Sequence, residues 1–213
     1  MKKKIIKDGF GQITEKKSRF IGQIHSVSSP EMAMEKVTEV KKKYFDAKHH
    51  CYAYICGDDG ELKKYCDDGE PSGTAGMPLL TLLESSGLTD CVVIVTRYFG
   101  GVLLGTGGLV RAYRAAGEEA LSDAVLADIT KGYEVFICID YCDESRLRRI
   151  IDNMNSAGKH VVISKTDYSD TCDMTLSLEK EAYPVLEKYV TDMFAGKVAP
   201  EIKGEIMIEV ERG

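Results

Sequence analysis

The chain has 213 residues and a formal net charge of −6, with 44% hydrophobic and 29% charged residues, a balance typical of a folded globular protein rather than a disordered one. The length fits one large domain or two small ones, and no apolar run approaches the roughly 18 residues of a membrane-spanning helix, so a transmembrane helix is excluded and we expect no membrane partner. Residues 1–7 carry the basic residues of a signal peptide but only two consecutive isoleucines in place of its apolar core, so we expect a cytoplasmic protein.

The first part of the sequence alternates strands with helices. Alternating or continuous apolar residues predict strands at 9–14, 19–27, 50–56, 62–66 and 91–95. Helices are predicted at 30–44, 77–86 and from 109 to about 126. The hydroxyls of Ser28 and Ser29 before Pro30 are typical of a helix start, and the uninterrupted run at 91–95 is typical of a strand buried on both faces.

The second part of the sequence has the element order βαββαβ. The predicted strands are 134–141, 160–165, 173–178 and 202–210, and the predicted helices are 144–157 and 182–194. This order is that of a split-βαβ, ferredoxin-like unit. A change in charge marks the boundary, because residues 1–132 hold 18 basic and 18 acidic side chains and residues 133–213 hold 10 and 16. We therefore expect an α+β protein with domains at 1–132 and 133–213.

Two glycine-rich segments, residues 67–78 and 96–114, hold eight of the 20 glycines. The second segment leaves a buried strand and enters a helix, whose free N–H groups and positive dipole end favour anions. Residues 91–117 also contain three arginines and no acidic residue. The candidate anion or nucleic-acid site is formed by Arg97, Gly100, Gly101, Gly105, Gly107, Gly108, Arg111 and Arg114.

Two standard phosphate motifs do not fit this segment. A Walker A loop needs a lysine that is absent here, and a G-x-G-x-x-G dinucleotide motif would need glycine where Val110 stands. The competing interpretation is a tight packing loop, with Arg114 paired to Glu118 four residues later on the helix surface.

The first glycine-rich segment carries Asp67, Asp68 and Glu70 within four residues. Clustered carboxylates bind magnesium or act in acid–base chemistry, but they also cap turns and helix starts, and we favour capping. Asp68, Glu70, Ser72 and Thr74 form a second candidate loop. The sequence predicts no metal site and no cofactor.

Seven cysteines are an odd number in a chain of this length, and we expect buried, reduced thiols rather than a disulfide framework or a zinc site. The run His49-His50-Cys51 resembles a nucleophile pair, but neighbours in a strand point to opposite faces, so His50 and Cys51 diverge. His49 and Cys51 share a face without a third orienting group. The role of these residues stays open.

Several motifs together resemble the YigZ/Impact family. They are DGEP at 68–71, GTAG at 73–76, VTRYFGG at 95–101, GGLVRAY at 107–113, KSRFI at 17–21 and A-x-H-x-C-x-A-Y at 47–54. The resemblance implies an N-terminal domain like domain 2 of ribosomal protein S5 and a ferredoxin-like C-terminal domain similar to the last domain of elongation factor G. It also implies a link to translation, because eukaryotic Impact proteins regulate translation, partly through an RWD domain that this chain lacks.

Three functions follow as hypotheses. We expect a non-enzymatic, translation-associated regulator that binds RNA, the ribosome or a phosphate-bearing ligand through the loop at 100–108. One alternative is a protein–protein regulator that docks on a translation-related protein through its acidic C-terminal domain. The other is an enzyme acting on a small phosphorylated or acyl substrate, with Asp67, Asp68 or Glu70 as base or metal ligand. The sequence does not indicate an oligomeric state.

Overall fold

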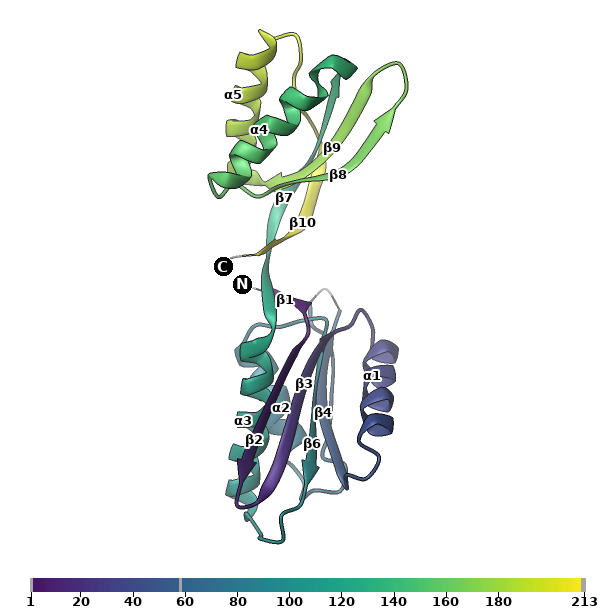
Figure 1. Ribbon diagram of the computed structural model, residues 1–213, viewed down its shortest axis with the longest axis vertical. Coiled ribbons are helices and arrows are strands. Elements are labelled where there is room, and N and C mark those ends of the chain that lie inside the picture. The colour runs from purple at the N-terminus through teal and green to yellow at the C-terminus, as the bar shows by residue number, and fades with distance from the viewer. Residues whose placement is uncertain (1, 58, 212–213) are drawn as a thin grey trace. The chain divides into compact units, whose positions relative to one another are not determined.

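The computed structural model describes residues 2–57 and 59–211, and the chain divides into a first compact unit up to Asp128 and a second unit, Ile129–Val210. Helices and strands are mixed in both units, which confirms the α+β class (Figure 1). Within the described residues, no helix combines the length and the apolar character needed to cross a membrane.

The first unit is built on a five-stranded sheet of order β2-β3-β6-β4-β5. Every neighbouring pair in it is antiparallel. The strands are β2 (Gly9–Glu15), β3 (Ser18–Ser26), β4 (His49–Cys56), β5 (Leu62–Cys66) and β6 (Cys91–Tyr98). The helices are α1 (Pro30–Lys43), α2 (Gly76–Ser85) and α3 (Thr106–Asp123). Ser29 caps α1, as the sequence predicts, because its hydroxyl accepts a hydrogen bond from the amide of Met32.

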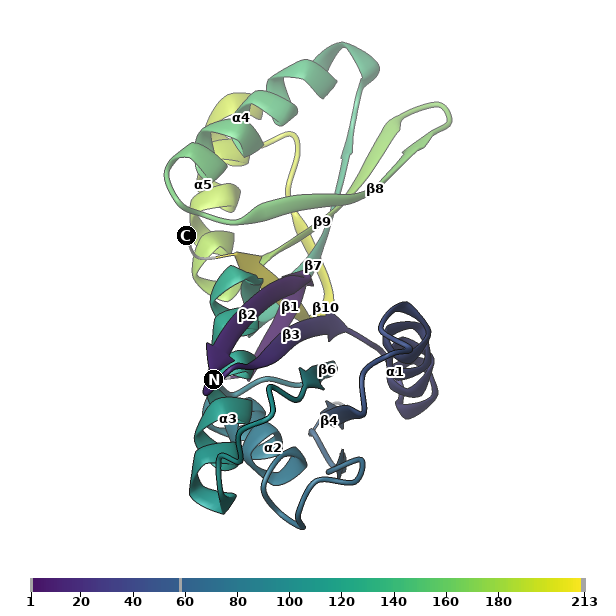
Figure 2. The same cartoon turned by 60° about the horizontal axis from the view of Figure 1, so that its bottom comes forward.

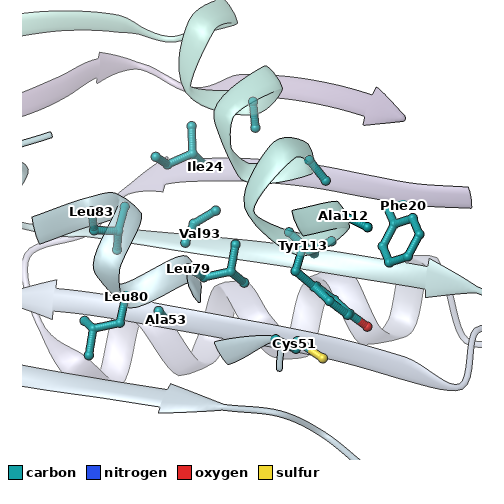
Figure 3. Close-up of a cluster of buried hydrophobic side chains, with 14 of the residues drawn as sticks. Phe20, Ile24, Cys51, Ala53, Leu79, Leu80, Leu83, Val93, Ala112 and Tyr113 are labelled. Carbon is teal, nitrogen blue, oxygen red and sulfur yellow. The ribbon is translucent and has the colours of Figure 1, made fainter. Parts of the chain in front are cut away.

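Helices cover both faces of this sheet, with α2 and α3 on one face and α1 on the other (Figure 2). Successive residues of the central strands therefore enter two different cores. In β6, Val93 and Val95 pack with α2 and α3, whereas Val92 and Ile94 pack with α1. The prediction that residues 91–95 are buried on both faces is confirmed. Figure 3 shows the larger core, in which Leu79, Leu83 and Tyr113 meet Val93 and Phe20.

Glycines let α3 lie very close to the sheet. A Cβ at Gly22 of β3 would stand 2.1 Å from the carbonyl oxygen of Ala116, and one at Gly9 of β2 would stand 2.0 Å from that of Ala120. Because glycines of β2 and β3 face alanines of α3, the backbone of the helix lies in direct contact with the two strands. This contact sets the position of α3 along the sheet.

The second unit has the element order βαββαβ that the sequence predicts. Its elements are β7 (Val125–Ile139), of which Val125–Asp128 belong to the first unit, α4 (Glu144–Ser156), β8 (Val161–Tyr168), β9 (Cys172–Glu179), α5 (Tyr183–Phe194) and β10 (Glu201–Glu211), of which Glu211 belongs to the first unit. Short 3₁₀ turns at Tyr141–Asp143 and Lys180–Ala182 precede the two helices. The strand order is β10-β7-β9-β8, and the unit has a core of its own that includes Ile137, Leu147 and Leu176.

The structure differs from the prediction mainly at the N-terminal segment, at α3 and at the start of β7. The basic N-terminal segment forms a strand, β1 (Lys2–Lys7), which pairs with β7. Strand β7 starts nine residues before the expected Glu134, and α3 ends at Asp123, because Ala124 is already extended (ψ 149°). Helix α3 also begins at Thr106, inside the segment expected to be loop. Val125 and Leu126 continue the helical spacing in sequence, but they belong to the strand.

Candidate functional site

The strand register brings the chemically distinctive segments to one end of the first unit. Tyr98, the last residue of β6, pairs with Arg19 near the start of β3, and Arg97 pairs with His49, the first residue of β4. The β2–β3 turn, the α1–β4 connection and the β6–α3 loop therefore gather at the same end, which is the lower end of this unit in Figure 1. We call it the loop end.

A pocket of about 410 Å³ opens at the loop end. Its lining is partly polar and partly apolar. The polar lining residues are Lys48, His49, Glu70, Arg97 and Thr106, and the apolar ones are Pro71, Phe99, Leu103, Leu104 and Leu109. Gly105 completes the lining, so the pocket touches the residue at which α3 starts.

The start of α3 is uncapped. Its N-cap residue is Gly105, which has a φ of +74° that favours glycine, and no side chain among residues 2–57 and 59–211 caps the first amides of the helix. The first turn contains no acidic residue. The amides of Thr106, Gly107 and Gly108 have no partner within the helix geometry, and they lie at the positive end of an 18-residue dipole. An anion would satisfy both features.

The carboxylate of Glu70 is a buried part of the polar lining. Oε1 of Glu70 accepts hydrogen bonds from Nη1 of Arg97 at 2.6 Å and from the Tyr113 hydroxyl at 2.7 Å, and Nε2 of His49 lies 4.0 Å away. The side chains of Glu70 and Arg97 are 4% and 6% exposed. Burial raises the pKa of Tyr113, and the neighbouring Cys51 and Glu70 act in the same direction. Tyr113 therefore stays protonated, and its hydroxyl donates a hydrogen bond to Glu70.

Arg97 retains unused hydrogen-bonding capacity. Its guanidinium reaches Glu70 and, at 3.4 Å, the hydroxyl of Ser18, but its buried Nε has no hydrogen-bond partner in the described part of the chain. Leaving this enclosed N–H unpaired costs stability, so the contact of Arg97 with Glu70 is kept in spite of that cost.

The three predicted arginines are placed differently. Arg97 faces Glu70, as described above. Arg111 is exposed, and its Nη1 lies 3.6 Å from where a Cβ at Gly107 would stand, so it is next to the first turn of α3. Arg114 pairs with Glu118 at 2.8 Å on the helix surface, which is the contact that the packing interpretation describes. Only Arg97 among them lines the pocket.

The predicted glycines have distinct local roles. Gly101 and Gly105 have φ values of +81° and +74°, in the left-handed region. Gly100 packs against the β2–β3 turn, because a Cβ on it would stand 2.0 Å from the backbone of Lys17. Its amide donates to the Ser18 hydroxyl at 3.1 Å. The loop is therefore held against the basic turn formed by Lys16 and Lys17.

In the first glycine-rich segment the carboxylates bond within the protein. Asp67 accepts hydrogen bonds from the amides of Gly73, Ala75 and Gly76 at 2.8–3.0 Å, which caps the start of α2. Asp68 accepts from the amide of His50 at 2.7 Å and pairs with Lys41 at 3.0 Å; burial opposes its ionisation, yet these bonds hold its pKa below the usual value. The Thr74 hydroxyl donates to the carbonyl of Pro71, while Ser72 is exposed.

Cys51 has the environment of a core thiol. Its Sγ donates to the carbonyl of Asp67 at 3.0 Å, and burial raises its pKa, so it stays protonated. Figure 3 shows it beside Tyr113 in the core. The ring of His50 points to the other face, where its Nε2 lies 3.1 Å from the carbonyl of Tyr44, as strand alternation predicts. Within the described ranges, no group of three or more His, Cys, Asp or Glu side chains is arranged to hold a metal.

The sequence pattern did not predict that Lys48 and His49 line the pocket. Lys48 and His49 come from the start of β4, and they meet the α3 loop only because β4 pairs with β6. Glu70 and Arg97 are 27 residues apart in the sequence, and no local sequence motif predicts their contact.

Comparisons with known proteins place these residues within a shared domain. The profile of the Impact N-terminal domain matches residues 16–121, which include all of the pocket. IMPACT family member YvyE of Bacillus subtilis is 33% identical over 89% of this chain and 85% of its own length. IMPACT family member YigZ of Escherichia coli is 46% identical over 50% of this chain and 53% of its own length. A crystal structure described as that of a hypothetical protein matches with a TM-score of 0.58 and 29% identity, and the match covers 94% of this chain and 97% of the other.

Proposed function

This chain belongs to the Impact family, and from that premise we propose that it is a translation-associated regulator that binds RNA or the ribosome through phosphate groups at the start of α3. The family resemblance supports the link to translation. The geometry of the loop end supports the phosphate.

One observation carries the proposal: the uncapped start of an 18-residue helix borders a pocket that Lys48 lines, and Arg111 lies beside the first turn of that helix. Free helix amides, the positive dipole end and these side chains all favour a phosphate at the same place. Glu70 does not oppose it, because its charge is compensated by Arg97 at 2.6 Å.

Binding is favoured over turnover by the state of the candidate catalytic groups. Asp67 caps α2, Asp68 pairs with Lys41, and Glu70 is bonded to Arg97 and Tyr113. Each carboxylate thus has a partner within the fold, and the Cys51 thiol is buried and protonated.

The test is binding of ribosomes and of cellular RNA across a salt series from about 50 to 200 mM. We expect affinity to fall as salt rises. Lys48→Ala and Arg111→Ala should each lower the affinity and reduce the slope of log K against log salt by about 0.7 to 0.9, which is the contribution of one phosphate contact. Lys63→Ala is the matched control. Lys63 lies on β5 opposite Ile55 in the strand register, toward the end of β4 that is remote from His49 and the pocket.

Two results would contradict the proposal. One is salt-insensitive binding or no binding to either partner. The other is an equal loss of affinity in all three variants, because that would point to the overall charge of the first unit rather than to the pocket.

A further inference from the structure

We propose that the loop end recognises single-stranded RNA, with one unpaired nucleotide seated in the pocket: its base against Phe99 and its phosphate at the start of α3. This inference rests on the proposed function and names the class of nucleic acid. It follows from the exposed aromatic and apolar side chains at this end, which phosphate binding alone does not explain.

Several large apolar side chains are exposed at the loop end. Phe45 is 83% exposed in the α1–β4 connection, and Leu103 and Phe99 in the β6–α3 segment are 82% and 47% exposed. Phe45 is joined to this segment through its neighbour Asp46, which accepts a hydrogen bond from the Tyr98 hydroxyl at 2.6 Å. Apolar groups concentrated at one end of a domain mark an interaction surface.

Exposed lysines lie at the same end of the first unit as these apolar groups. Lys16, Lys17 and Lys48 are exposed, and none of them forms an ion pair with a described carboxylate. Lys16 and Lys17 are in the turn on which Gly100 packs, and Lys48 is on the pocket rim. Aromatic side chains interleaved with lysines are the pattern by which proteins bind single strands, because bases stack on the rings while cations track the backbone.

The pocket has both apolar and polar lining residues, and one nucleotide offers an apolar base and a charged phosphate. Its volume of about 410 Å³ lies within the range of small-ligand sites. Phe99 and Leu104 provide an apolar wall for a base, and Thr106 with the first amides of α3 provides donors for a phosphate. The guanidinium of Arg97 lies 5.4 Å from the centre of the Phe99 ring and holds that ring in place.

A duplex does not fit this arrangement. Bases in a helical duplex are stacked and paired, so they cannot enter a pocket without being extruded, whereas an unpaired segment offers them freely. An acidic peptide would match the cations but not the flat face of Phe99. Single-stranded RNA is therefore the occupant that uses both the polar and the apolar lining of the pocket.

The experiment measures fluorescence anisotropy of the full-length protein with a labelled single-stranded RNA of about twelve nucleotides and with the same strand in a duplex. We expect the single strand to bind about tenfold more tightly. Phe99→Ala should weaken single-strand binding by about tenfold and leave duplex binding nearly unchanged, since a base–aromatic stack is lost. Phe10→Ala is the matched control, because Phe10 is 48% exposed on β2, away from the loop end.

Four outcomes would overturn the inference. Equal, salt-dependent binding of single strand and duplex would reject it but leave the proposed function standing. Equal effects of Phe99→Ala and Phe10→Ala would reject the base site. Displacement of the RNA by an acidic peptide whose own binding needs Phe99 would assign the surface to a protein partner. Absence of binding to any RNA would also reject the inference, and together with absence of ribosome binding it would reject the proposed function.

Discussion

The contact between Glu70 and Arg97 determines what the pocket can do. Two buried charges at 2.6 Å stabilise each other, but each depends on the other, because an ion taken out of water without its partner is strongly unfavourable. The pair also fixes Phe99, whose ring lies beside the guanidinium. The carboxylate that resembles a catalytic group in the sequence therefore serves to orient an arginine.

Glu70→Gln should destabilise the first unit by about 3 kcal/mol, because it leaves the Arg97 charge buried without a counter-charge. The expected readout is loss of hydrogen-exchange protection in the β6 amides, which lie in the core of this unit. Glu118→Gln is the matched control. It removes the partner of Arg114 from an ion pair whose side chains are 43% and 49% exposed, and it should cost less than about 1 kcal/mol. Equal effects of the two substitutions would contradict the structural role of the buried pair.

At the scale of elements, close packing of α3 on β2 and β3 positions the start of the helix. Glycines on the strands face small residues of the helix, so the backbones approach more closely than larger residues would allow. A shift of α3 along the sheet would move its first amides away from Lys48 and His49. The packing of the helix thus determines the shape of the anion site.

Gly22→Ala should therefore destabilise the first unit by about 2 kcal/mol, since the new Cβ would stand 2.1 Å from the carbonyl oxygen of Ala116 and the helix must move. The same exchange at Gly204 of β10 is the control, because no atom lies within 4 Å of its added Cβ. There alanine should be neutral or stabilising by about 0.5 kcal/mol. Hydrogen exchange in α3 and β6 measures the first case and in β10 the second. Unchanged protection in Gly22→Ala would show that α3 tolerates the shift.

The elements that sequence reasoning predicts best are those with strong local signals. The cap at Ser29, the doubly buried run at 91–95 and the hairpin at 50–66 have periodicity or turn residues that settle them. Strand β1 and the start of β7 lack such signals, because the lysines of β1 and the helix-like spacing of Val125 and Leu126 favour other structures. Pairing between β1 and β7 outweighs these local preferences.

The site divides in the same way. A helix start after this loop could be predicted to within three residues, because glycines at 105, 107 and 108 follow a buried strand, although Gly107 and Gly108 belong to the helix. The wall formed by Lys48 and His49 could not, because it depends on the register that pairs His49 with Arg97. Arg114 has the right charge and spacing in sequence, but its pairing with Glu118 uses that charge on the helix surface.

At the scale of the whole molecule, each unit buries its own core. Residues such as Leu79 and Val93 form the core of the first unit, and residues such as Leu147 and Leu176 form that of the second. The charge follows a similar division, since residues 1–132 are neutral and residues 133–213 carry the whole net charge of −6. An acidic second unit repels phosphate backbones, which favours the first unit as the RNA-binding part.

Separate cores predict that damage to one unit stays local. Leu176→Ala removes a fully buried side chain from β9 and should destabilise the second unit by about 2 to 5 kcal/mol, through lost apolar contact and the cavity left behind. Hydrogen exchange should accelerate in β9 and α4 while the β6 amides keep their protection, and single-stranded RNA should still bind. Leu83→Ala, an equally buried leucine of the first unit, is the reciprocal control and should produce the opposite pattern. Loss of protection in both units from either substitution would mean that the chain unfolds as one cooperative body, and the loop end could then not be treated as a site that the first unit supports by itself.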